Sequence, residues 1–205
     1  MANRFWQAHG NSQEMNVGGS DFAHGYVGLY SAGASSAIDL QTRFNTGPEE
    51  WIGDQSTVIA AKRSDAVNIV TIRPWAYSPA DYLSLFGNDA NNWAAHLTPF
   101  LDTYLAAGFK VVCITSYASS TQSNINRAAQ DPLIRSWVGA QHCTAVVDVA
   151  SDPILGNDAT RNNLTYFEPG GHLTDAGQAI LYSYFAPVMD SILYLAGRMV
   201  WGSRR

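Results

Sequence analysis

The stretch NWAAHLTPFLDTYLAAGFKVVCIT, residues 92–115, decides the fold of this chain. In its first part, apolar residues recur at the three- and four-residue spacing of a helix with one buried face. These residues are Trp93, Leu97, Phe100, Leu101, Tyr104 and Leu105. Gly108 is typical of a residue that ends a helix, and the run after it is rich in β-branched residues. A helix followed directly by a buried strand indicates a crossover between two parallel strands.

Working outward, further short runs of β-branched or aromatic residues predict strands on both sides of this stretch. With the strand at 110–115, the predicted set is 4–8, 26–30, 67–72, 110–115 and 144–149. Segments of helical periodicity separate them, and the last helix is expected to begin at Thr174 as its N-cap. The alternation predicts an α/β protein: a flavodoxin-like three-layer α/β/α sandwich with a five-stranded parallel sheet. The length suits one domain spanning residues 1–205.

Composition and charge exclude several classes of partner. The 12 Lys and Arg residues are scattered and the net charge is −5, so we expect no binding of nucleic acid. No apolar run is long enough to span a membrane, and the first residues lack the apolar segment of a signal peptide. We therefore expect a soluble protein, which agrees with a cytoplasmic or a virion-associated location. Cys113 and Cys143 lack metal-ligand spacing and are expected to be buried free thiols, with no metal and no cofactor.

Two residues could carry chemistry where strands of this sheet end. In open parallel sheets the ligand crevice lies beyond the carboxyl ends of the strands. Ser12 follows the first predicted strand in HGNS, after Gly10, which allows a sharp turn. A serine hydroxyl becomes nucleophilic when a base takes its proton. His172 lies in the glycine-rich loop EPGGHLTDAG, which opens the last helix, so we expect it at the same edge of the sheet.

The segments around these two residues resemble the conserved blocks of one family. HGNS, residues 9–12, resembles the GDS block of the SGNH hydrolases, the GDSL-like lipases and esterases. GGHLTDAGQAIL, residues 170–181, resembles their C-terminal block DGxHLTxxGxxxL and is the more specific match. Residues 29–44 are similar to the second block, and 125–149 to the segment before the histidine loop. The resemblance to a divergent SGNH hydrolase thus covers nearly the whole chain.

The resemblance implies a role for each matching residue. Ser12 would attack an ester carbonyl, and His172 would act as its base. The backbone amides of Ser12 and Gly33 would bind the oxyanion, where negative charge develops in the transition state.

The chain departs from the family pattern in two places. The family's third block has an asparagine after the strand at 67–72, where this chain reads RPWAYSP. The indole N–H of Trp75 or the amide of Asn88 are the candidate replacements for that donor. The family's aspartate lies three residues before the histidine, where this chain has Pro169. Either Glu168 or a backbone carbonyl would then orient the imidazole of His172.

The sequence therefore predicts a serine esterase, similar to acetylesterases, that acts through an acyl-enzyme on Ser12. A small ester or an O-acylated saccharide is the expected substrate. The alternative is a catalytically degenerate module of the same fold, which would bind a carbohydrate surface or form part of a virion. The absence of the family's asparagine and aspartate favours this alternative. The motifs HGNS and GGHLTDAGQAIL favour the enzyme.

Overall fold

The computed structural model describes residues 3–10, 38–44, 48–74, 79–118, 124–169 and 171–202. Its strands are β1 (Asn3–Gly10), β2 (Ile38–Phe44), β3 (Ala66–Ile72), β4 (Lys110–Ile114) and β5 (Ala145–Val147). Its α-helices are α3 (Pro48–Ala60), α4 (Pro79–Phe86), α5 (Ala90–Ala106), α6 (Asn124–Ser136) and α7 (Asp175–Gly202). Two short 3₁₀ helices, Val149–Ser151 and Asp158–Thr160, follow β5.

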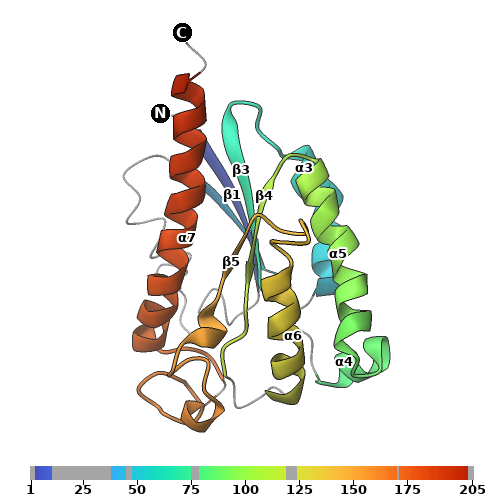
Figure 1. The fold of residues 1–205 in the computed structure, drawn as a ribbon, viewed down its shortest axis with the longest axis vertical. Coiled ribbons are helices and arrows are strands. Elements are labelled where there is room, and N and C mark those ends of the chain that lie inside the picture. Colours follow the sequence, from blue (N-terminus) through green and yellow to red (C-terminus); the bar gives the residue numbers. More distant parts are fainter. Residues whose placement is uncertain are drawn as a thin grey trace.

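The five strands form one parallel sheet in the order β2-β1-β3-β4-β5. Helix α7 covers one face of the sheet, and α3, α5 and α6 lie on the other (Figure 1). The predicted three-layer α/β/α sandwich with a five-stranded parallel sheet is thus confirmed. Because all strands run the same way, their carboxyl ends meet at one edge of the sheet.

The second strand of the described sheet, Ile38–Phe44, was not among the predicted strands. The predicted strand at 26–30 lies outside the described residues and stays a prediction. The sequence IDLQTRF alternates between apolar and polar residues, a pattern that suits a strand with one buried face. The run 26–30 is more continuously apolar, which favoured it as a buried parallel strand. However, β2 lies at the edge of the sheet, where a strand does not need apolar residues throughout.

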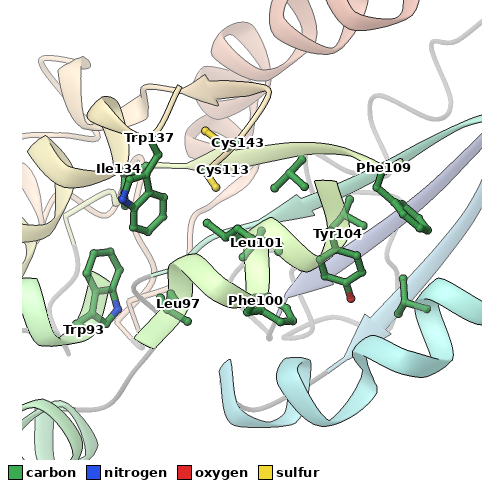
Figure 2. Packing of buried hydrophobic residues seen from close by; sticks show 14 of the residues in the cluster. Trp93, Leu97, Phe100, Leu101, Tyr104, Phe109, Cys113, Ile134, Trp137 and Cys143 are labelled. Atoms are coloured by element: carbon green, nitrogen blue, oxygen red, sulfur yellow. The ribbon is translucent and has the colours of Figure 1, made fainter. Parts of the chain in front are cut away.

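The central strands divide the apolar core into two clusters. Along β4, Val111 and Cys113 join the cluster under α5, whereas Val112 and Ile114 join the cluster under α7. In the first cluster the rings of Trp93 and Trp137 stack with their centroids 5.4 Å apart (Figure 2). The same cluster contains Cys113 and Cys143, and both thiols are free and buried, as predicted. Burial on both faces is the reason why β3 and β4 read as nearly continuous apolar runs.

The crossover from β3 to β4 agrees closely with the prediction from its sequence. Asp89 caps α5, because its side chain accepts the backbone N–H of Asn91 at 2.7 Å. Gly108 follows the helix with a φ of +84°, a left-handed conformation that glycine adopts without steric cost. The chain then enters β4, where Cys113 pairs with Ile72 of β3. This unit places the carboxyl ends of β3 and β4 side by side.

Candidate active site

Two of the predicted site residues follow shortly after strands that end at the carboxyl edge of the sheet. β1 ends at Gly10, two residues before Ser12, and β3 ends at Ile72, three residues before Trp75. Ser12, Gly33 and Trp75 themselves lie outside the described residues, so their roles stay predictions. His172 and Glu168 are both described, and the geometry of the site is built from them.

A tight turn holds the loop that carries His172. Phe167 and Leu173 form an antiparallel bridge, and inside it the N–H of Glu168 donates to the carbonyl of His172 at 2.8 Å. The N–H of Gly171 donates to the carbonyl of Glu168 at 2.9 Å, which closes a four-residue turn. Pro169 occupies the second position of this turn, where its fixed φ is favourable. The proline that replaces the family's aspartate therefore has a structural role here.

This turn brings the side chains of Glu168 and His172 together. Two residues that are paired across antiparallel segments project their side chains to the same side. Glu168 and His172 are such a pair, so their side chains lie close together although the residues are four positions apart in the chain. Glu168 Oε2 lies 3.7 Å from His172 Nδ1, close enough for charge attraction and longer than a hydrogen bond. The His172 side chain is 23% exposed and that of Glu168 is 42% exposed. The structure thus places the carboxylate of Glu168 near Nδ1 of His172, and the choice between this carboxylate and a backbone carbonyl as the orienting group stays a prediction.

Thr174 fastens the other side of the loop to the start of α7. Its hydroxyl donates to the carbonyl of Thr165 at 2.6 Å and accepts the N–H of Gly177 at 3.3 Å. Its N–H donates to the carbonyl of Tyr166 at 3.0 Å. The hydroxyl contact with the first turn of the helix confirms the predicted N-cap. His172 is therefore held between a closed turn and a capped helix.

Apolar packing fixes the loop against the carboxyl edge of the sheet. Phe167 and Leu173, which flank the turn, are buried in the same cluster as Ile114 and Tyr117 of the β4 end. The N–H of Ala118 donates to the carbonyl of Leu155 at 2.6 Å and ties the segment after β5 to the end of β4. His172 thus lies at the edge predicted for it, on the face of the sheet that α7 covers.

Arg73 is a residue at this edge that the sequence reasoning missed. It follows β3 directly and is only 1% exposed, which is unusual for an arginine. Its Cζ lies 4.7 Å from the centroid of the Tyr117 ring, a cation–π contact. A basic residue directly after a buried strand, at the position where the family has its asparagine block, was the signal in the sequence.

The end of β4 contains a second serine, which its environment makes a poor nucleophile. Ser116 is completely buried, and its N–H donates to Asp131 Oδ1 of α6 at 2.9 Å. Burial raises the pKa of Asp131 to about 6, although the bond from Ser116 and the charge of Arg127 lower it. This pair fastens α6 to the sheet. It does not present a hydroxyl to a substrate.

Asn88, the alternative oxyanion donor, is an exposed turn residue with a φ of +59° between α4 and α5. A second histidine–carboxylate pair, His142 Nδ1 to Asp102 Oδ1 at 2.7 Å, joins α5 to the segment before β5, near the amino end of that strand. Within the described ranges no three His, Cys, Asp or Glu side chains cluster in a way that could hold a metal ion. Of the helices the structure describes, none is long and apolar enough to cross a membrane.

Comparisons with known proteins agree on the fold. No protein-family model matches the chain, and no curated protein sequence matches it. A member of the lipolytic G-D-S-L family from Veillonella parvula DSM 2008 matches with a TM-score of 0.67 and 11% identity, over 88% of this chain and 95% of that one. The psychrotrophic esterase EstA from Pseudoalteromonas sp. gives 0.61 and 13%, over 94% and 100%. An acetylxylan esterase from Geobacillus stearothermophilus gives 0.60 and 16%, over 90% and 94%. The chain therefore has the fold of the G-D-S-L (SGNH) proteins, as its sequence motifs implied.

Proposed function

We propose that this chain is a serine ester hydrolase that removes a small acyl group, with Ser12 as nucleophile and His172 as base. The observation that carries the proposal is the closed turn that presents His172 at the carboxyl edge with Glu168 Oε2 3.7 Å from its Nδ1. Such a carboxylate favours the tautomer in which Nε2 is free to accept a proton. The first strand of the same sheet ends two residues before Ser12.

The reaction follows from these roles. His172 Nε2 takes the proton of the Ser12 hydroxyl while Oγ bonds to the carbonyl carbon, and the carbonyl oxygen becomes an oxyanion. When the carbonyl re-forms, the C–O bond to the alcohol breaks and His172 returns its proton to the leaving oxygen. A water molecule then repeats the sequence and releases the acid. The amides of Ser12 and Gly33 are the proposed oxyanion donors.

An acetylated saccharide is the substrate class we propose. The support is the fold shared with the acetylxylan esterase of Geobacillus stearothermophilus, which extends over 90% of this chain. The shared fold by itself leaves the leaving group open, because one fold hosts many functions. Acetate release from acetylated xylo-oligosaccharides, compared with release from nitrophenyl acetate, measures this preference.

Fluorophosphonate labelling tests the nucleophile. The folded protein should gain one adduct, and mass spectrometry of its peptides should place that adduct on Ser12, because only an activated serine attacks the phosphorus at a useful rate. The variant Ser12→Ala and the urea-unfolded protein should remain unlabelled. An unmodified Ser12 in the folded protein would contradict the proposal and favour the non-catalytic module of the same fold.

Replacing Glu168 tests the orienting carboxylate. Glu168→Gln should lower kcat for nitrophenyl acetate about tenfold, a smaller loss than for a buried catalytic aspartate, because the 3.7 Å pair is partly exposed to solvent. The turn itself should survive, since its hydrogen bonds use the backbone of Glu168 and His172. An unchanged kcat would show that another acceptor orients the imidazole.

A further inference from the structure

We propose that Cys113 and Cys143 form a redox-sensitive pair, in which hydrogen peroxide oxidises the two thiols to an internal disulfide. The pair lies on the face of the sheet that α5 and α6 cover, whereas the histidine loop packs on the face under α7. Neither the candidate active site nor the proposed ester hydrolysis enters this inference.

The two thiols are in contact inside the cluster under α5. Cys113 belongs to β4, and Cys143 belongs to the segment that leads into β5, so the whole of α6 lies between them in the sequence. Figure 2 shows their sulfur atoms next to each other, and a hydrogen bond joins the two side chains. Both thiols are free, and the exposed fractions of the two residues are 0% and 4%. The fold thus brings two groups together that can be oxidised as a pair.

The surroundings make Cys143 the more reactive of the two thiols. A thiolate attacks a peroxide, whereas a protonated thiol is a poor nucleophile. The hydrogen bond from Cys113 lowers the pKa of the Cys143 thiol, and the backbone N–H of Ala145 lowers it further, against the effect of burial. Burial raises the pKa of the Cys113 thiol, and the bond to Cys143 raises it as well. Cys143 is therefore the attacking sulfur, and Cys113 is the second thiol.

The side of the pair that faces solvent is also the side of Cys143. Residues 138–141, which come just before it, are exposed, and the side chain of His142 is 31% exposed. Cys113 lies inside the sheet, where it pairs with Ile72 on one side and Val146 on the other. A small oxidant that enters from the surface therefore meets Cys143 first.

The backbone around Cys143 can supply the movement that a disulfide needs. The two sulfur atoms must come closer together than a hydrogen bond holds them. Cys113 is fixed by its two neighbouring strands, whereas Cys143 lies outside the helices and strands. The N–H of Cys143 contacts the carbonyl of Trp137 only at 3.4 Å, longer than a normal hydrogen bond. The N–H of Thr144 donates to the carbonyl of Val111 at 2.7 Å and keeps the segment beside β4 during this movement.

One molecule of peroxide balances the reaction. The thiolate of Cys143 attacks one peroxide oxygen, the O–O bond breaks, and the other oxygen leaves as hydroxide, which takes up a proton to become water. Cys143 is then a sulfenic acid. The sulfur of Cys113 bonds to the sulfur of Cys143, the S–O bond breaks, and the oxygen leaves as water with the proton of Cys113. The two thiols lose two electrons, and the peroxide gains them.

Treatment of the folded chain with a small molar excess of hydrogen peroxide tests the proposal. Remaining thiols are blocked with N-ethylmaleimide, and the peptides are analysed by mass spectrometry without reductant. We expect one cystine that joins Cys113 to Cys143 within one molecule, and its return to two thiols after dithiothreitol. Peptides decide rather than the mass of the whole chain, because methionine also takes up oxygen from peroxide.

Single replacements assign the two roles. In Cys113→Ser, oxidation of Cys143 should stop at the sulfenic or sulfinic acid, because the second thiol is gone. In Cys143→Ser, the thiol of Cys113 should be oxidised about tenfold less than Cys143 is in the parent at the same dose, because it is buried and protonated. Circular dichroism checks that both variants fold.

Two results would overturn the pair. One is a folded parent in which Cys143 becomes a sulfinic acid while Cys113 stays a thiol. The other is a folded parent in which both thiols stay unmodified at a dose that oxidises them in urea. If a variant fails to fold, the parent alone decides: the internal cystine supports the proposal, and its absence overturns it. Esterase activity is not part of the readout, so the outcome is independent of the proposed function.

Discussion

Replacing His172 by alanine should lower kcat for nitrophenyl acetate by about 10⁴-fold, the loss typical when a triad member is removed. The reason is that the serine hydroxyl needs a base to take its proton, and two nearby carboxylates have other partners: Glu168 lies 3.7 Å from His172 Nδ1, and Asp131 accepts the N–H of Ser116. KM should change little, because the base acts on the reacting atoms rather than on substrate binding. Steady-state kinetics at neutral pH, with the fold checked by circular dichroism, measure the effect.

His142→Ala is the matched control for this experiment. His142 also pairs through Nδ1 with a carboxylate, that of Asp102 at 2.7 Å, and is similarly half-buried. It lies before β5, at the amino end of that strand, so its loss should leave kcat unchanged and cost only a small amount of stability. Equal losses of activity in the two variants would mean that the histidine effect is structural. An active His172→Ala would contradict the assignment of the base.

Replacing Gly177 by alanine should lower the free energy of unfolding by about 3 kcal/mol. A Cβ at this position would meet the carbonyl oxygen of Tyr166 and lie 3.1 Å from Cβ and Cδ2 of Leu173. The carbonyl belongs to the backbone that Thr174 holds, so it cannot move without opening the histidine loop. Overpacking of this kind costs roughly 1–3 kcal/mol or more, and it exceeds the gain in helix propensity from alanine. Thermal unfolding should show a melting temperature about 6–12 °C lower.

Gly53→Ala provides the control for backbone and propensity effects. Gly53 is also a helical glycine, in α3, but no atom lies within 4 Å of the position its Cβ would take. This variant should be stabilised by about 0.5–1 kcal/mol, because alanine loses less backbone entropy in a helix. A Gly177→Ala variant as stable as the parent would show that the histidine loop can shift without cost. In that case the loop would not hold His172 as rigidly as the hydrogen bonds indicate.

Much of the sheet was predictable because its signals are local. The strands β3 and β4 and the helix between them follow from apolar periodicity and from single residues such as Gly108, whose effects span only a few positions. The position of β2 was not predictable from the sequence, because an edge strand with alternating apolar and polar residues carries a weaker signal than a continuous apolar run. In the histidine loop, the motif HLTDAG identified Thr174 as the N-cap of α7, because a cap acts within one turn of helix, whereas the role of His172 stays a prediction.

The sequence by itself determined the fold class, the strands β3 and β4 with the helix between them, and the loop that carries the candidate base. Only the tertiary structure decided which groups meet at the carboxyl edge. Glu168 lies beside His172 because Pro169 and Gly171 close a turn between them, and a spacing of four residues does not specify that turn. Arg73 meets Tyr117 because β3 and β4 are neighbours in the sheet, although 44 positions separate the two residues in the chain. Local propensity acts over a few residues, whereas the charges and donors of a site are brought together by strand pairing and by packing of the two faces of the sheet.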